Sequence, residues 1–199
     1  MIFSFKENYV LENNVVRLTP LLEEDFGKLV PFANNEPDLW EYSLVQATSE
    51  EGLKNYLKLA IESRKNENAY PFLVFDKRTN QFAGSTRFYD IQLAQNTVQL
   101  GFTWYGKAFQ RTGLNQNCKF LLLEFAFEKM NLDRVEFRAD NDNTKSIVSM
   151  KNIGCTQEGI LRNHGYKPDR TRRDSIVLSI LKDEWFNSVK ANLQNKISG

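Results

Sequence analysis

The segment from Val98 to Met130 contains the residues of this chain that are best suited to bind a phosphate. An alternating run over residues 98–104 predicts a strand, a glycine-bearing loop follows over residues 106–113, and a long amphipathic helix begins after it. The first turn of a helix has four N–H groups without internal partners, and the helix dipole adds partial positive charge there. Because Gly113 has no side chain, a ligand can approach the backbone closely. This order of elements predicts a site for a phosphate or pyrophosphate.

Two common phosphate-binding patterns are absent from this loop. The dinucleotide-binding pattern needs Gly-x-Gly-x-x-Gly and an acidic residue about 20 positions further on, whereas residues 110–115 read Gln-Arg-Thr-Gly-Leu-Asn. The nucleoside-triphosphate pattern needs Gly-Lys-Ser/Thr at the start of the helix, and that is also missing. Taken alone, the loop is consistent with either a phosphate site or an ordinary turn.

Further short motifs follow the long helix. Residues 133–140 alternate and predict another strand, and residues 141–144 predict the cap of a helix that ends at Gly154. Three more strings come next in order: Glu158-Gly159-Ile160-Leu161-Arg162, Arg173-Asp174-Ser175 and Glu184-Trp185.

Together these motifs resemble the GNAT superfamily of N-acetyltransferases. Residues 110–115 are similar to its Gln/Arg-x-x-Gly-x-Ala/Gly signature, which binds the pyrophosphate of acetyl-CoA, although Asn115 stands where a small residue is usual. The later motifs resemble the Rim-type (RimJ/RimL-like) branch, which includes the ribosomal-protein N-terminal acetyltransferases. The resemblance covers about residues 15–186.

The resemblance implies where acetyl-CoA would bind. In this family the strand before the loop splays from its neighbour, and the pantetheine arm of CoA enters the gap. The strand residues beside the arm would be Phe102, Thr103 and Trp104. The loop residues around the pyrophosphate would be Gln110, Arg111, Thr112, Gly113, Leu114 and Asn115. Asn143 would cap its helix and contact the arm, while Arg111 and Lys119 would either add positive charge or lie on the solvated surface.

The resemblance also suggests two catalytic residues. The family's serine that matches Ser146 is placed to interact with the CoA sulfur, although an ordinary surface serine is the alternative. Met150 stands where many relatives place a tyrosine that acts as the general acid, and Gly165 stands near the position where some Rim-type relatives place a glutamate base. His164 is the candidate base because it adjoins that position and histidine changes charge near neutral pH. A structural histidine, with proton removal through ordered water, is the alternative.

Periodic patterns elsewhere predict the rest of the fold. Strands are expected over residues 15–21, 70–75, 82–91 and 176–181, and helices over residues 23–30, from the Ser49 cap onward, and 184–196. Pro31 is expected to stop the first helix. The resemblance implies that these elements belong to one GNAT domain over residues 1–199, with a core over about 15–186. Its fold class is α/β (α+β), a mixed and mostly antiparallel central sheet with helices on both faces.

Composition limits the class of protein. The chain has 199 residues, 41% hydrophobic and 26% charged, with a net charge of +1 that argues against nucleic acid as the main partner. Its single histidine excludes a multi-histidine metal site, and we expect no metal; the two cysteines are expected to be buried and reduced. No secretory signal and no apolar stretch of roughly 18 residues is visible, so we expect a cytoplasmic protein and no membrane partner.

The leading hypothesis is an acetyl-CoA-dependent N-acetyltransferase that acts on a primary amine, either a protein N-terminus or a small molecule. A non-catalytic CoA-binding module is the alternative, because the tyrosine and glutamate are missing. A nucleotide- or RNA-binding protein, suggested by the basic run over residues 170–173, is a third. The acceptor pocket is expected from residues 40–64 and 161–173, and a homodimer is left open.

Overall fold

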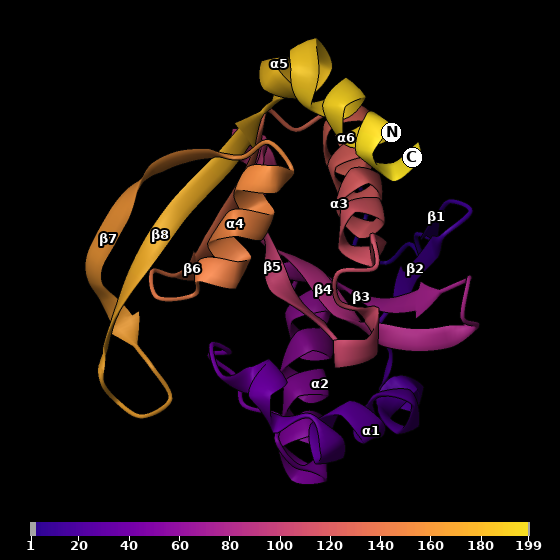
Figure 1. Ribbon diagram of the computed structural model, residues 1–199, viewed down its shortest axis with the longest axis vertical. Helices are drawn as coiled ribbons and strands as arrows, with labels where there is room; N and C mark the ends of the chain where they lie inside the picture. The colour runs from indigo at the N-terminus through magenta and orange to yellow at the C-terminus, as the bar shows by residue number, and fades with distance from the viewer. Residues whose placement is uncertain (1–2, 199) are drawn as a thin grey trace.

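The computed structural model describes residues 3–198, which form a single eight-stranded sheet with helices on both faces (Figure 1). The strand order is β1-β2-β3-β4-β5-β6-β8-β7, and every neighbouring pair is antiparallel except β5 and β6. The strands are β1 (Leu11–Glu12), β2 (Val16–Pro20), β3 (Ala69–Asp76), β4 (Gln81–Gln92), β5 (Thr97–Tyr105), β6 (Arg134–Asp140), β7 (Thr156–Tyr166) and β8 (Arg172–Leu181). The predicted fold class is confirmed.

Helices cover both faces of the sheet. In Figure 1, α1 and α2 lie below the sheet, and α3 and α4 lie above it. The helices are α1 (Phe26–Asn35), α2 (Glu50–Lys65), α3 (Leu114–Glu124), α4 (Thr144–Asn152), α5 (Lys182–Glu184) and α6 (Lys190–Ser198). A π-helical segment continues α3 over Phe125–Lys129, and another joins α5 to α6 over Trp185–Val189. The core fills the space between the sheet and these two helical layers.

The helix α2 begins as its sequence predicts. The Ser49 hydroxyl accepts a hydrogen bond from the Gly52 amide at 3.1 Å, which satisfies one of the free N–H groups at the helix start. Leu53, Leu57 and Ala60 share its buried face. This face packs on the sheet, so the helical spacing of the apolar residues correctly predicts which side of α2 is buried.

The predicted stop at Pro31 is wrong. A short 3₁₀ turn over Glu23–Asp25 leads into α1, which contains Pro31 and continues to Asn35. Proline inside a helix removes one backbone hydrogen bond and costs about 3 kcal/mol. Here the burial of Leu29 and Phe32 on either side of Pro31 offsets that cost.

The C-terminal boundaries also differ from those predicted. The last strand begins at Arg172 rather than at residue 176, because its first residues pair with β7. The terminal helix is divided into α5, a π-helical segment and α6. Both cysteines, Cys118 and Cys155, are free and buried, as expected.

Two further findings concern the described part of the chain. No helix in it is both long enough and apolar enough to span a membrane. Within residues 3–198, no group of three or more His, Cys, Asp or Glu side chains is arranged to hold a metal ion.

Candidate active site

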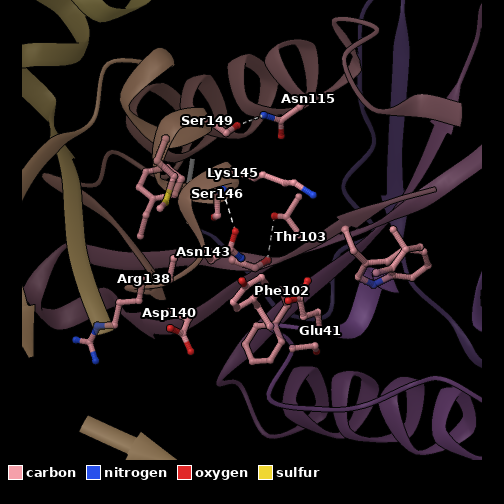
Figure 2. A pocket seen from close by; sticks show the side chains of 18 of the residues that line it. Glu41, Phe102, Thr103, Asn115, Arg138, Asp140, Asn143, Lys145, Ser146 and Ser149 are labelled. Atoms are coloured by element: carbon pink, nitrogen blue, oxygen red, sulfur yellow. Dashed lines mark hydrogen bonds between the residues drawn. The ribbon is translucent and has the colours of Figure 1, made fainter. Parts of the chain in front are cut away.

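The strands β5 and β6 separate after a short parallel contact. They pair from Thr97–Arg134 to Gln99–Glu136, and beyond that point neither strand pairs with the other. A cavity of about 1260 Å³ opens there, between α3 and α4 on one side and α2 on the other. Figure 2 shows Phe102 and Thr103 of β5 around the same space as Ser146 of α4. The splayed strand that the family resemblance implies is therefore present next to the loop.

A β-bulge bends β5 at the mouth of this gap. The register with β4 shifts between Ser85 and Arg87, and on the facing part of β5 Phe102 has a left-handed φ of 48°. The Tyr56 hydroxyl of α2 donates to the Phe102 carbonyl at 3.4 Å, and Trp104 Nε1 donates to the same hydroxyl at 3.3 Å. These two bonds hold the bulge from the side of α2.

The loop before α3 is anchored to the turn between β3 and β4. Gly113 is the N-cap of α3 and has φ 82°, a left-handed conformation that favours glycine. Arg78 Nη1 donates to the Thr112 carbonyl at 2.8 Å, and Arg78 Nη2 lies 2.6 Å from Asp76 Oδ2. Burial alone would raise the pKa of Asp76, but the hydrogen bonds from Arg78 lower it below its ordinary value. The loop is therefore held in place by Arg78, a residue that lies outside the loop and is itself fixed by Asp76.

The N-terminus of α4 borders the cavity opposite β5. Asn143 Oδ1 accepts from the Ser146 amide at 3.0 Å, which confirms the predicted cap. Ser146 itself is half-buried and lines the cavity. Asn115 Nδ2 donates to Ser149 Oγ at 2.9 Å, so the residue that departs from the family signature links the start of α3 to the second half of α4.

Lys119 does not lie on the solvated surface, so that reading is wrong for this residue. Lys119 belongs to α3 and its side chain is buried, and its Nζ donates to Thr103 Oγ1 at 2.9 Å. Burial lowers the pKa of its ammonium to about 8. Arg111, the other predicted cation, is exposed within the loop and has a left-handed φ of 60°.

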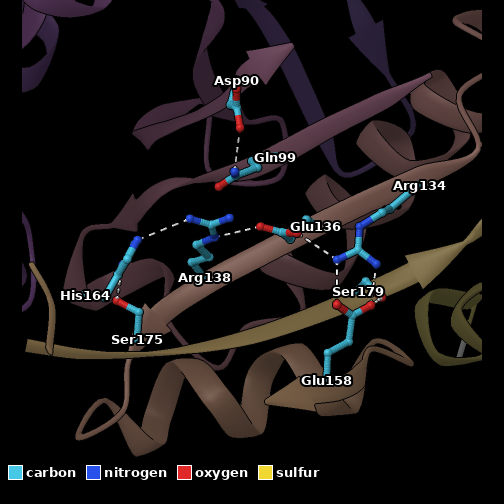
Figure 3. A network of polar contacts seen from close by, with 9 residues as sticks. All are labelled: Asp90, Gln99, Arg134, Glu136, Arg138, Glu158, His164, Ser175 and Ser179. Atoms are coloured by element: carbon cyan, nitrogen blue, oxygen red, sulfur yellow. Dashed lines mark hydrogen bonds and ion pairs between the residues drawn. The ribbon is translucent and has the colours of Figure 1, made fainter. Parts of the chain in front are cut away.

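His164 lies at the other end of the cavity, within a chain of polar contacts (Figure 3). Its Nδ1 is 3.0 Å from Ser175 Oγ, and its Nε2 is 3.5 Å from Arg138 Nη1. In a neutral imidazole, Nε2 is the nitrogen that can accept from Arg138, because a guanidinium only donates, and Nδ1–H is then the donor to Ser175. Arg138 is held in turn by Glu136, whose Oε1 accepts from Arg138 Nε at 2.7 Å.

Glu158, the acid that begins the string Glu158-Gly159-Ile160-Leu161-Arg162, is held in an ion pair. Its partner is Arg134, whose Nη2 lies 2.7 Å from Glu158 Oε2 (Figure 3). Hydrogen bonds from Arg134 lower the pKa of Glu158 to about 2. A carboxylate with so low a pKa is a poor base.

Most of the predicted site residues meet in the cavity. Those that line it are Phe102, Thr103, Trp104, Gln110, Arg111, Asn115, Lys119, Asn143, Ser146 and His164. Those of the predicted set that do not line it are Thr112, Gly113 and Leu114. Both predicted acceptor segments contribute, through residues near Trp40 and near Tyr166. The sequence reasoning missed Tyr89 and the β6 residues 137–140, because their position depends on how distant strands pair.

Comparison with known proteins identifies the family. The acetyltransferase (GNAT) domain model matches residues 16–156. The uncharacterized N-acetyltransferase YnaD of Bacillus subtilis (strain 168) is 27% identical over 128 residues, which is 64% of this chain and 74% of the relative.

Solved structures have the same fold. A GCN5-related N-acetyltransferase from Brucella melitensis is 23% identical with a TM-score of 0.88, and the match covers 98% of this chain and 87% of that one. Mycobacterium smegmatis RimJ in complex with CoA-disulfide is 17% identical with a TM-score of 0.79, covering 95% of this chain and 93% of that one. At these identities the structures show the fold alone, and the Rim-type branch remains a prediction. Since the domain match includes the loop, the splayed strands and α4, the chain belongs to the GNAT family and is an acetyltransferase.

Proposed function

We propose that this protein transfers the acetyl group of acetyl-CoA to a primary amine, either a protein N-terminus or a small molecule. The observation that carries the proposal is the gap between β5 and β6, which opens directly beside the loop before α3. In this proposal the pyrophosphate binds at the start of α3, where free N–H groups and the helix dipole favour an anion. The pantetheine arm then runs along residues 102–104, whose edge toward β6 has no strand partner there.

The chemistry needs little more than position and two proton movements. Holding the amine against the thioester carbonyl supplies much of the rate. His164, at the end of the cavity away from the loop, is the proposed base that removes a proton from the amine. Ser146, on the side of α4, is proposed to donate a hydrogen bond to the leaving sulfur.

Acetyl-CoA should stabilise the folded protein. A ligand present at one hundred times its Kd adds about 2.7 kcal/mol, which corresponds to roughly 5 to 10 °C in Tm for a chain of this size. Differential scanning fluorimetry with acetyl-CoA, and with adenosine as a control that lacks the pyrophosphate, measures this. No shift with acetyl-CoA at millimolar concentration would contradict the binding site.

Turnover should then appear as free CoA released in the presence of an amine. The panel would pair each amine with its acetylated form, for example a short peptide with a free N-terminus and the same peptide blocked. Release with the free amines alone supports the proposal. Binding of acetyl-CoA without release from any amine would instead favour a CoA-binding role without amine transfer.

Ser146→Ala should lower kcat about tenfold and leave the Kd for acetyl-CoA within about twofold, because the lost hydrogen bond forms fully only as the sulfur leaves. Steady-state kinetics and calorimetry on the same preparation separate the two quantities. Ser188→Ala, which changes an exposed serine outside the cavity, is the matched control. Equal losses in binding and turnover would make Ser146 a residue that positions CoA.

A further inference from the structure

A buried ammonium lies in the wall of the cavity without an anionic partner. Lys119 is 5% exposed, and Thr103 Oγ1 accepts from its Nζ at 2.9 Å. The Thr103 hydroxyl is also 2.7 Å from Thr86 Oγ1. Within residues 3–198 no carboxylate pairs with Lys119, and the Phe137 ring of β6 lies 5.7 Å from Nζ.

Such a charge is costly to the fold. An ammonium has three donors, and only the bond to Thr103 is made by this side chain to the described residues. A buried charge without an ion-pair partner destabilises a protein, and an apolar side chain of similar volume would pack there at lower cost. A fold that keeps a lysine at the edge of a ligand cavity places a positive charge where a ligand can meet it.

The location of this charge matches the leaving group of the proposed reaction. Thr103 belongs to the segment along which the pantetheine arm would run, and it follows the bulge at Phe102. Breaking the thioester leaves a negative charge on sulfur, and a nearby ammonium in a buried site both stabilises that charge and can neutralise it. Met150, which also lines the cavity, has no proton to give.

We propose that Lys119 is the general acid of this acetyltransferase and protonates the CoA sulfur as it leaves. The inference depends on the proposed function. When the tetrahedral intermediate collapses, the C–S bond breaks and its electron pair goes to sulfur. A proton passes from Nζ to that sulfur and forms the thiol, which leaves Lys119 as a neutral amine. The acceptor amine has meanwhile lost one proton to its base, and Lys119 regains one from solvent through the cavity.

The protonation behaviour of the neighbourhood is consistent with this role. Burial lowers the pKa of Lys119 to about 8, close to the ordinary value of about 8.5 for a thiol. The titratable groups that face it are Cys118 of α3 and Cys155 before β7, and burial raises the pKa of each thiol to about 12. β5 and β6 present Thr103 and Phe137, which do not titrate. The ammonium is therefore charged at pH 7 and has no anion beside it.

Three variants test the proposal: Lys119→Met, Lys119→Arg and, as a matched control, Lys129→Met, which changes an exposed lysine in the π-helical segment that continues α3. Lys119→Met should lower kcat at least one hundredfold, the usual worth of a general acid, with the Kd for acetyl-CoA within about threefold. Lys119→Arg keeps the charge but not the transferable proton, so its kcat should also fall. The wild-type rate should decline above about pH 8, and this alkaline limb should disappear in both Lys119 variants.

Stability gives a readout that a structural role would not produce. Because the lowered pKa means that the folded state holds the proton less tightly than the unfolded state, the destabilisation by Lys119 is complete below pH 8 and disappears by about pH 10.5. Ligand-free Lys119→Met should therefore melt at or above the wild-type temperature at pH 7, and this difference should shrink as pH rises. Thermal melts from pH 7 to 10 measure it.

The outcomes separate this inference from the proposed function. Wild type that binds acetyl-CoA but acetylates no amine would overturn the proposed function and this inference with it. Active wild type, with full kcat and an unchanged alkaline limb in Lys119→Met, would overturn the inference alone. A Lys119→Met protein that loses stability and acetyl-CoA affinity together would show that the lysine is structural.

Discussion

Gly113→Val is expected to lower the affinity for acetyl-CoA about one hundredfold or more while the protein stays folded. Gly113 has φ 82°, which a β-branched residue adopts only at a cost, so the start of α3 must shift. Losing one or two charge-assisted hydrogen bonds to the pyrophosphate costs about 3 kcal/mol, and each 1.4 kcal/mol is a factor of ten. Calorimetry measures the change in Kd.

Two further variants identify the cause of such a loss. A Cβ at Gly113 would meet no protein atom within 4 Å, so crowding would come from the ligand and strain from the backbone. Gly113→Asn tolerates the left-handed conformation and tests crowding with little strain. Gly159→Val adds the same side chain at another open glycine without a positive φ and should not change binding. A folded Gly113→Val protein with wild-type affinity would place the phosphate elsewhere.

Local patterns predicted most of the fold because they report directly on burial. The alternating run over residues 98–104 forms β5, and the long amphipathic helix predicted after the loop forms α3, which packs between the sheet and α6. The mistake at Pro31 has the same origin. A helix ends where its total free energy turns unfavourable, and the burial of Phe32 beyond the proline is a tertiary contact that a local rule omits.

The candidate site could be predicted only where its residues are close in sequence. The loop and the Asn143 cap are local, so spacing was enough to find them. The support of the loop by Arg78 and of the bulge by Tyr56 joins residues 34 and 46 positions apart, and nothing in either segment indicates its partner. The burial of Lys119 was missed for a related reason, since a lysine on a helix is usually exposed.

His164→Ala is expected to lower kcat about one hundredfold if this residue is the base, and His164→Gln should behave like alanine because it cannot accept and release the proton. Nδ1–H donates to Ser175, which leaves Nε2 as the basic nitrogen, and its 3.5 Å contact with Arg138 is long enough for an acceptor amine to replace.

The pH profile decides between His164 and the water route. A histidine base stops working when it is protonated, so the acid limb of the rate profile should disappear in both variants. If the amine instead loses its proton through water, the limb should follow the pKa of whichever amine is supplied and survive both substitutions. Rates for two amines of different pKa, measured with each variant, separate these cases. A full rate with an unshifted limb would remove His164 from the mechanism, and the exposed ring would then serve to hold Arg138 and Ser175 in place.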